Sequence, residues 1–537
     1  MLAGWNIMHV RTEDMKRFIG VAIVTLVLAA LIAALVFRLL PQAQAPQPQL
    51  PQSQTNPLPQ VIPSLREWHG ESGAFALEST SRIVLDTATG DQFAGAARLF
   101  AEDLSLITGH ALPIISDSAA GQGDIFLSLA TTEKVTEQAL GDEGYSLTIA
   151  GAVTLRAHTT TGVFYGTRTI LQMLLANATK AHLPRGSARD YPRYRERGFM
   201  LDVGRKYFPL SQLKEYVRAM SYFKLNDFHL HLNDNQLIVG IGPDWTTKYA
   251  AFRLSSPRFP GLAAKDGAYS RQDMRELQDF AKSYGVTITP EIDVPAHALA
   301  LTQYRPDLAS PSLDKSLLDL ANPNTLPFVK SLWDEFLPWF DSKDVHIGAD
   351  EYNALEGEAY RQFVNACDDY LRSKGYTVHA WGNLTPMTGT TPIHTDVVMD
   401  VWDTAFASAS DLARQGYHVV NAIDTYLYIV PKAGVYNDYL DTKTLYEQWD
   451  PSIFDLRNPA QNLTRGDRQL LGAKFAVWND KLGTLISDAD VAARVLAALP
   501  TVGGKFWGPP ARDMTYAQFM EVARSVGQAP GLNLPAV

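Results

Sequence analysis

Two adjacent carboxylates that follow an apolar run are the residues best suited to chemistry in this chain. Asp350 and Glu351 come directly after residues 345–349, which are apolar or small apart from His346. Adjacent acids are often only surface charge, but this run predicts a buried strand with the pair at its mouth. A carboxylic acid placed there can transfer protons, and a carboxylate can stabilise a developing positive charge. The pair therefore predicts acid–base catalysis.

Three tryptophans stand at the ends of three other apolar runs. They are Trp381, Trp402 and Trp478. A single tryptophan is more often part of a core than of a binding site, but three at strand ends can line one pocket. Aromatic walls with a few fixed polar groups bind the apolar faces of sugars. The carboxylates and the indoles together predict hydrolysis of a glycosidic bond.

The adjacency of the two carboxylates restricts the mechanism. Consecutive side chains diverge, so this pair is poorly placed to act as acid and nucleophile on opposite sides of one anomeric carbon. Some glycosidases instead use the substrate's own 2-acetamido oxygen as the nucleophile. We then expect Glu351 to protonate the leaving oxygen and later to activate water. We expect Asp350 to orient and stabilise the acetamido group as it becomes an oxazolinium ion. The role of Glu351 requires a raised pKa, which burial and its anionic neighbour favour.

The elements that must position these residues alternate between strands and helices from residue 197 onward. The candidate strands are 198–203, 227–232, 287–292, 344–348, Thr377–Trp381, 397–402, 419–423 and 473–478. Helical stretches fall between several of them, at 211–223, 270–284, 325–340 and 356–374. Eight such repeats predict an α/β fold, a (β/α)8 TIM barrel over residues 195–530. The site then lies at the carboxyl ends of the strands.

Polar side chains gather at the ends of the first three strands. They are Asp202, Arg205, His229, His231, Asp234, Glu291, Asp293 and His297. The pair His229 and His231 can suggest metal ligation, but no third ligand follows at a suitable spacing. We therefore favour two buried structural histidines, and we predict neither a metal nor a cofactor.

Four motifs resemble glycoside hydrolase family 20, the β-N-acetylhexosaminidases. They are LDVGRKYFPL (201–210), FHLHLND (228–234), PEIDVPAH (290–297) and HIGADE (346–351). The resemblance covers residues 195–530 and implies the same barrel fold, and the preceding domain resembles the α+β domain that often comes before that barrel. The segment TYLYIVPKAGVYNDYL (425–440), followed by GAKFAVWND (472–480), is most similar to the dispersin B and lacto-N-biosidase branch.

The resemblance also implies roles for polar residues. Arg205 is expected to bind hydroxyls of the terminal sugar, although it could instead be a structural ion-pair partner of Asp202. Asp234 and His297 are expected to form a supporting pair near the acid, although His297 could equally cap its loop. Asp480 is expected to accept hydrogen bonds from the O4/O6 edge of the sugar.

The remaining implied roles concern the aromatic residues. The walls of the pocket for the sugar and its acetamido methyl group are expected to be Trp381, Trp402 and Trp478. Tyr426 is expected to donate to the acetamido oxygen, while Tyr428 could simply face the core. The chain departs from the family pattern at two positions. Asn235 stands where many members have a second acid, and Ala354 stands where dispersin B has a tyrosine. These departures leave the second sugar of the substrate open.

A smaller domain and a spacer precede the barrel. Residues 64–190 combine short β-type runs (82–85, 124–129, Tyr145–Ile149 and Val153–Ala157) with helical stretches at 92–108 and 162–176, which predicts a small α+β domain. Residues 41–63 are rich in Pro and Gln without hydrophobic periodicity, which predicts an extended linker.

The N-terminus carries an apolar segment of membrane-spanning length. Residues 18–37 are apolar or small except for Thr25, and about 20 such residues cross a bilayer core. We predict a transmembrane anchor at 18–40, with a cytoplasmic stub at 1–17 and the rest in the periplasm or outside the cell, because more positive charge precedes the segment than follows it. The alternative is a signal peptide cleaved near Ala45, which would give a secreted protein.

The composition excludes several classes of protein. The chain has 537 residues, 46% of them hydrophobic, and a formal charge of -10, with 47 basic against 57 acidic residues. Nucleic acid is not an expected partner, because phosphate binding needs clustered cations. The single cysteine, Cys367, excludes an intrachain disulfide framework and a Cys-rich metal site.

Together these features predict a membrane-anchored retaining hydrolase that removes terminal β-linked N-acetylhexosamine, GlcNAc or GalNAc, from an oligo- or polysaccharide. Two alternatives stay within the family: release of a disaccharide, and cleavage of poly-N-acetylglucosamine. A third is a catalytically inactive sugar-binding protein.

Overall fold

The computed structural model describes residues 55–129, 140–236, 244–481, 486–508 and 514–534, with four positions near the N-terminus. The chain divides into two units, Met1–Gln54 and Thr55–Val537, and every element described below belongs to the second. The predicted stub and anchor lie outside the described residues, apart from those four positions. Among the described helices, none is both long and apolar enough to cross a bilayer.

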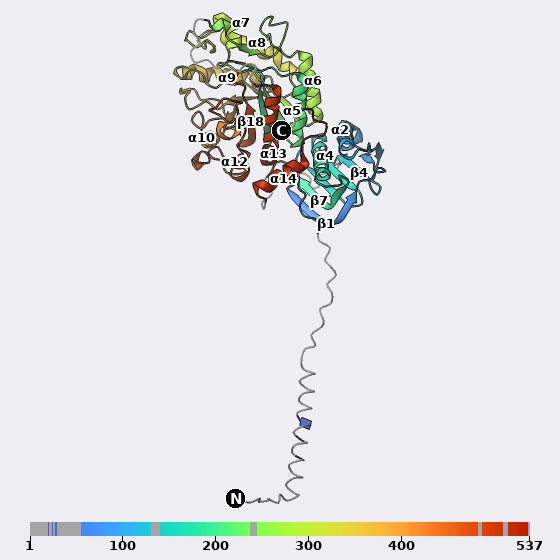
Figure 1. The fold of residues 1–537 in the computed structure, drawn as a ribbon. Coiled ribbons are helices and arrows are strands. Elements are labelled where there is room, and N and C mark those ends of the chain that lie inside the picture. Colours follow the sequence, from blue (N-terminus) through green and yellow to red (C-terminus); the bar gives the residue numbers. More distant parts are fainter. Residues whose placement is uncertain are drawn as a thin grey trace, which may run out of the picture. The chain divides into compact units, whose positions relative to one another are not determined.

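The small domain is built on a seven-stranded mixed sheet (Figure 1). Its strands are β1 (Glu67–Ala76), β2 (Ile83–Asp86), β3 (Ile114–Asp117), β4 (Ile125–Leu129), β5 (Tyr145–Ile149), β6 (Val153–Ala157) and β7 (His182–Asp190). The order is β1-β7-β5-β6-β4-β2-β3, antiparallel from β1 to β6 and parallel from β6 to β3. With helices α2 (Gly90–Thr108) and α4 (Thr160–Leu175), this is an α+β domain.

Helix α4 joins the small domain to the barrel. It packs on the sheet and also contacts α5 (Leu210–Tyr222) and α14 (Tyr516–Val526), so nearly all of its residues are buried. The red α14 lies beside the cyan α4 in Figure 1, although they are far apart in the sequence. The buried Gln172 amide on α4 donates to the carbonyls of Tyr222 and Ile62. These contacts hold two sequence-distant parts of the chain together.

The end of the predicted linker is folded rather than extended away from the domain. Asn56 Nδ2 donates to the carbonyls of Gly73 and Arg185, and the apolar side chains of Val61 and Ile62 are buried. Residues 55–63 therefore belong to the small domain. The prediction of a linker reaching residue 63 was wrong for this part, because two apolar residues amid the prolines are enough to bind it to the core.

Eight parallel strands close into a barrel, as predicted. They are β8 (Glu196–Asp202), β9 (Asp227–His231), β12 (Thr287–Glu291), β13 (Asp344–His346), β14 (Thr377–Trp381), β15 (Val398–Val401), β16 (Val419–Asn421) and β18 (Leu470–Val477). Pairing of β16 with β18 completes the ring, and β17 (Tyr428–Ile429) adds to one end of β18. A short hairpin, β10 (Asn233–Asn235) and β11 (Ala250–Phe252), follows β9.

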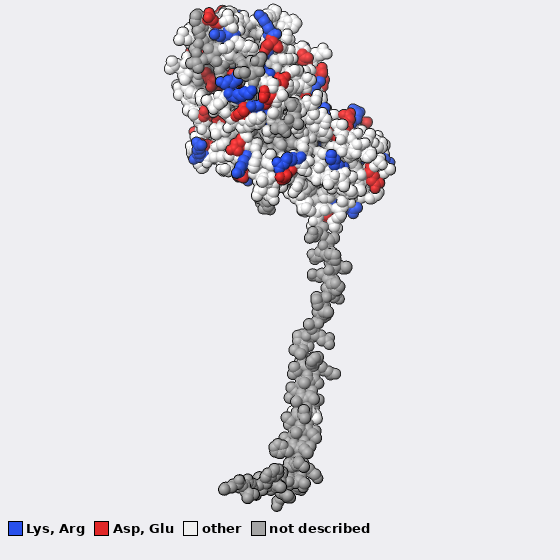
Figure 2. Space-filling model, in the orientation of Figure 1, with Lys and Arg blue, Asp and Glu red and all other residues white. Residues whose placement is uncertain are grey.

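Helices surround this ring. The longer ones are α5, α6 (Arg271–Ser283), α8 (Thr325–Phe336), α9 (Gly357–Ser373) and α13 (Asp488–Trp507); the shorter ones are α7 (Leu299–Tyr304), α10 (Ala409–Gln415), α11 (Asp424–Leu427) and α12 (Thr442–Glu447). The starts of α6 and α13 are fixed by capping boxes, in which Ser270 and Ser487 exchange hydrogen bonds with an Asp three residues on. On the face shown in Figure 2, acidic and basic side chains are interspersed.

The interior of the barrel is charged, whereas its outer wall is apolar. Lys474 on β18 lies 2.8 Å from Asp400 on β15 and 3.1 Å from His229 on β9. Because β16 separates β15 from β18, the contact with Asp400 crosses the inside of the barrel. Side chains at the intervening positions of the strands point outward. Among them, Phe199 of β8 and Phe228 of β9 stack on each other, and Tyr216 of α5 packs against both. The inner positions therefore form a buried polar network beneath the strand ends.

Candidate active site

A sharp turn after β13 presents the two predicted carboxylates. Gly348, Ala349 and Glu351 all have positive φ, at 70°, 72° and 48°, which is uncommon for residues with a side chain. A Cβ atom on Gly348 would lie 1.8 Å from Oδ1 of Asp293, and this same oxygen accepts a hydrogen bond from the Ala349 amide at 3.1 Å. Asp293 thus shapes the turn, and only glycine fits at its first positive-φ position.

Asp350 is buried, and its Oδ1 has no hydrogen-bond partner among the described residues. Burial and the neighbouring Glu351 carboxylate raise the pKa of Asp350 to about 6, although His297 opposes the shift. A buried carboxylate oxygen without a hydrogen-bond donor is a strong acceptor. Asp350 is therefore suited to accept a hydrogen bond from a bound polar group such as an amide N–H.

Glu351 lies in a different environment from its neighbour. Its side chain is 51% exposed, and its Oε2 is 3.4 Å from Nε2 of His297. This contact with His297 lowers the pKa of Glu351 below its usual value. The expectation of a raised pKa at Glu351 was therefore wrong, because the upward shift falls on the buried Asp350 and His297 stabilises the Glu351 carboxylate.

The structure brings the side chains of His297 and Asp234 together. His297 Nδ1 lies 3.0 Å from Oδ1 of Asp234, whose Oδ2 is 2.7 Å from Nε2 of His231. Burial disfavours the imidazolium, but Asp234, Asp350 and Asp293 outweigh it and raise the pKa of His297 well above its usual value. The opposite balance lowers the pKa of Asp234, where Arg205 and His297 outweigh burial. The pair thus places a cation beside the exposed carboxylate of Glu351.

Arg205 is held by three carboxylates. Its Nη1 lies 2.8 Å from Asp234, 3.0 Å from Asp202 and 3.5 Å from Asp480. The structural ion pair with Asp202 is therefore present, yet the same guanidinium also adjoins Asp480 and lies 5.7 Å from the Trp478 ring. The structure brings Arg205 and Asp480 together at the edge of the aromatic residues, where both can meet the hydroxyl groups of a sugar.

The three predicted tryptophans belong to one cluster. With Tyr428, Met200 and several small apolar residues, Trp381, Trp402 and Trp478 pack together, and the ring centroids of Trp381 and Trp478 are 5.7 Å apart. Trp381 is the last residue of β14. Its backbone amide donates to the Gly348 carbonyl at 2.8 Å, which places it next to the turn that bears the carboxylates. The indole nitrogens of Trp402 and Trp478 are buried without a partner among the described residues. The cluster is thus an aromatic wall beside the turn.

The structure places Tyr428, rather than Tyr426, in this cluster. The Tyr428 ring is 5.7 Å from Trp478, and burial together with Asp350 raises the pKa of its hydroxyl well above the usual value. The Tyr426 hydroxyl instead accepts a hydrogen bond from the Leu456 amide at 3.1 Å. Helix α11 ends at Leu427 and β17 begins at Tyr428, so the change of backbone period turns the two side chains to different surroundings. Of the two tyrosines, Tyr428 therefore lies beside the tryptophans, and the role predicted for Tyr426 stays a prediction.

Two further acids of the site were found in the sequence but given no role. Asp293 shapes the turn, and Glu291 lies within hydrogen-bond distance of both His231 and the Trp381 indole. Both belong to the motif PEIDVPAH, so their presence near the site could be predicted. Their contacts could not, because each partner comes from another strand or loop.

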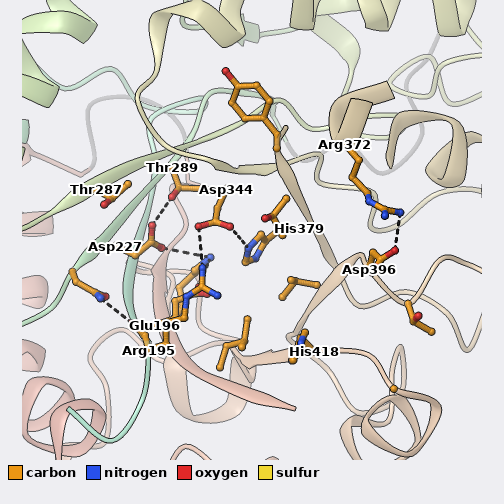
Figure 3. A pocket seen from close by; sticks show the side chains of 18 residues that line it. Arg195, Glu196, Asp227, Thr287, Thr289, Asp344, Arg372, His379, Asp396 and His418 are labelled. Carbon is orange, nitrogen blue, oxygen red and sulfur yellow. Dashed lines mark hydrogen bonds and ion pairs between the residues drawn. The ribbon is translucent and has the colours of Figure 1, made fainter. Parts of the chain in front are cut away.

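A charged hollow lies at the opposite end of the barrel, where the strands begin (Figure 3). The cavity measures about 560 Å³, and its acidic and imidazole side chains include Glu196, Asp227, Asp344 and His379. Glu196, His379 and Asp400 lie close enough together to share a metal ion. The Lys474 ammonium already lies 3.3 Å from Glu196 and 2.8 Å from Asp400, so this group of acids is balanced by a cation of the protein itself.

At the catalytic end, Asp293, His297 and Asp350 are also close enough to share a metal ion. The raised pKa of His297 opposes this use, because an imidazolium has no lone pair to give to a metal.

Relatives of known function resemble the chain over most of its length. Residues 194–507 match the model of the glycosyl hydrolase family 20 catalytic domain, and residues 58–191 match that of domain 2 of the same family. The lacto-N-biosidase of Bifidobacterium bifidum is 27% identical over 87% of this chain and 42% of that protein, so the chain spans less than half of that relative. The β-N-acetylhexosaminidase of Cellulomonas fimi is 25% identical over 81% of this chain and 87% of the relative.

Solved structures share the fold. The family 20 β-N-acetylhexosaminidase of Streptomyces coelicolor superposes with a TM-score of 0.73 at 24% identity, covering 90% of this chain and 99% of that one. The catalytic-domain model matches more than half of the chain. The chain therefore belongs to glycosyl hydrolase family 20, and it is a glycosidase.

Proposed function

We propose that the chain is a retaining β-N-acetylhexosaminidase that removes terminal β-linked GlcNAc or GalNAc by substrate-assisted catalysis. The observation that carries the proposal is the contrast within the pair. Asp350 is buried, and its Oδ1 has no hydrogen-bond partner in the described part of the chain, whereas Glu351 is half-exposed and contacts an imidazolium. The lacto-N-biosidase and β-N-acetylhexosaminidases among the relatives support the substrate class.

In this mechanism the acetamido oxygen of the substrate attacks the anomeric carbon while Glu351 donates its proton to the leaving oxygen. Asp350 accepts a hydrogen bond from the acetamido N–H and stabilises the positive charge of the oxazolinium ion. Glu351, now a carboxylate beside His297, then takes a proton from the water that opens the ring. Two displacements at one carbon retain its configuration.

Single substitutions at the pair test this assignment. Glu351→Gln is expected to lower kcat about 10²–10⁴-fold, because general acid–base catalysis contributes that much. Asp350→Asn is expected to lower it about 10²–10³-fold, because it removes the charge that stabilises the transition state. The measurement is steady-state hydrolysis of an alkyl β-N-acetylglucosaminide, whose leaving group requires protonation.

The matched control is Glu356→Gln, five residues further along the same loop, whose carboxylate binds the Tyr352 hydroxyl and the Asn353 amide. It is expected to keep kcat near the wild-type value. Wild-type turnover by Glu351→Gln would remove Glu351 from the mechanism. Absence of turnover by the unmodified protein would favour the catalytically inactive sugar-binding alternative.

Release of a disaccharide is the second candidate function, and the lacto-N-biosidase among the relatives favours it. An aryl glycoside of a galactosyl-N-acetylglucosamine disaccharide, compared with the aryl monosaccharide, separates the two activities. Faster release from the disaccharide would identify a disaccharide-releasing enzyme. Internal cuts in poly-N-acetylglucosamine would identify the third form of the activity.

We further propose that residues 18–40 anchor the enzyme in a membrane, with the catalytic barrel outside the cytoplasm. The apolar run and the charges that flank it support this location. Fractionation of cells that express the full chain, with the intact mass of the product, tests the proposal. A soluble product that lacks its first 45 residues would identify a signal peptide instead.

A further inference from the structure

Glu291 is a buried carboxylate beneath the catalytic pair, at the end of β12. Its Oε2 lies 2.6 Å from Nδ1 of His231 and 2.9 Å from Nε2 of His229. Its Oε1 accepts a hydrogen bond from the Trp381 indole at 2.7 Å and lies 3.2 Å from Nδ1 of His346. One side chain is thus held from three other strands of the barrel.

The first set of contacts leads to the proposed general acid. His231 Nε2 is 2.7 Å from Asp234, Asp234 is 3.0 Å from Nδ1 of His297, and Nε2 of His297 is 3.4 Å from Glu351. Both nitrogens of His231 face carboxylates, and although burial opposes the charge, Glu291 and Asp234 raise the pKa of His231 well above its usual value. The five groups therefore alternate in charge from Glu291 to Glu351.

The second contact leads to the aromatic wall. The Trp381 indole donates to Glu291 and packs 4.8 Å from the His346 ring and 5.7 Å from Trp478. A buried indole N–H needs an acceptor, and this carboxylate supplies it. The hydrogen bond fixes the orientation of a ring that the family resemblance places against the sugar.

We propose that Glu291 is a positioning residue that orients both the Asp234–His297 pair at the general acid and the Trp381 wall of the sugar pocket. Its side chain is fully buried, so it acts through the side chains that contact it. The inference rests on the proposed function, because it assigns Glu351 the role of acid. The titratable groups that face Glu291 are His229 and His231 on β9, His346 on β13, and Asp293 and Asp350 on the loops above.

Glu291→Gln tests the proposal, because it keeps the shape of the side chain but removes its charge and one acceptor oxygen. The amide has only one oxygen, so it cannot accept hydrogen bonds from the His231 and Trp381 N–H groups on separate oxygens. We expect kcat to fall about tenfold or more on substrates with a poor, alkyl-type leaving group, since small misplacements of catalytic groups cost this much. On an activated aryl glycoside, which needs little proton donation, we expect a smaller loss. The pH profile of kcat is expected to shift as well.

Glu196→Gln is the matched control, because it makes the same substitution at the opposite end of the barrel. Its side chain lies in the hollow of Figure 3, next to Lys474 and far from the carboxyl ends of the strands. Burial raises the pKa of Glu196 to about 7, so a neutral side chain is tolerated there. We expect this variant to keep the wild-type kcat, leaving-group dependence and pH profile.

Glu291→Asp keeps the charge and covers the case in which Glu291→Gln does not fold. It is expected to unfold near the wild-type temperature and to recover part of the pH profile, with a residual loss on poor leaving groups. Equal losses on good and poor leaving groups, with an unchanged pH profile in both variants, would show a merely structural role and overturn the proposal. If the unmodified enzyme does not hydrolyse N-acetylhexosaminides at all, the proposed function fails instead.

Discussion

Asp350 and Glu351 are adjacent in the chain but differ in solvation, and this difference gives each its own chemistry. Asp350 is buried, so its ionised form is disfavoured and would be stabilised by a hydrogen-bond donor. Glu351 is half-exposed, and its Oε2 lies 3.4 Å from Nε2 of His297, whose contact lowers the pKa of Glu351. When a substrate covers Glu351 and excludes water, its carboxylate loses solvation, which favours the protonated form that the first step of the proposed mechanism needs.

The raised pKa of Asp350 makes a stability prediction. Its folded-state pKa of about 6 exceeds the usual 3.8, so the associated stability is present below pH 3.8 and is lost as pH rises through 6. The ionised side chain then destabilises the fold by at most about 3 kcal/mol above pH 6. Asp350→Asn removes this ionisation. The variant is therefore expected to have a higher free energy of unfolding than the wild-type protein, and the difference is expected to be larger at pH 7.5 than at pH 4. Denaturant titrations at the two pH values measure this, and an equal effect at both would contradict it.

At the scale of single residues, the sequence was sufficient to select candidate site residues by type and motif. It was insufficient to predict properties that depend on the surroundings of each side chain. The acid pair, His297 and the three indoles are recognisable from type and motif. The direction of the Glu351 pKa shift and the choice between Tyr426 and Tyr428 depend on neighbours from other strands, which no local pattern contains.

The elements predicted best were those buried on both faces. All eight barrel strands were found because a strand between a polar interior and a helical layer still carries a strong run of outward apolar residues, such as those of β8 and β9. β1, β3 and β7 were not predicted, because they carry no long apolar run and most of their residues are exposed or half-buried. Their pairing is fixed by neighbouring strands rather than by their own composition.

The turn after β13 is the element on which the site depends, and Gly348→Ala tests it. A Cβ atom there would lie 1.8 Å from Oδ1 of Asp293, and the alanine would also have to adopt a φ of 70°. We expect a loss of at least about 1–2 kcal/mol of stability from the left-handed conformation alone. We also expect kcat/KM to fall about 10²-fold as the two carboxylates move.

Gly375→Ala provides the control for that experiment. Gly375 also has a positive φ, 84°, but nothing lies within 4 Å of an added Cβ. It is expected to lose a similar amount of stability while keeping wild-type kcat/KM. If both glycine variants kept full activity, the rigid turn would not be what positions the pair.

On the scale of the whole molecule, the small domain and the barrel share buried polar contacts. The Asp190 carboxylate at the end of β7 accepts hydrogen bonds from the Tyr145 hydroxyl, the Lys224 ammonium and the Trp507 indole. Lys224 and Trp507 belong to the barrel, so the domain is joined to the side of the barrel away from the strand ends that bear the site. The sequence indicated two domains, but it could not show this union, because the partners are as much as 317 residues apart.

The central claim is that the acetamido group of the substrate is the nucleophile, and a series of aryl β-N-acetylglucosaminides with zero to three fluorines on the acetyl group tests it most directly. Fluorine lowers the nucleophilicity of the acyl oxygen without reaching the leaving group. The account predicts that kcat/KM falls steadily with each fluorine, and that no covalent glycosyl-enzyme is trapped. A rate independent of fluorination, or an adduct on a carboxylate of the protein, would contradict it.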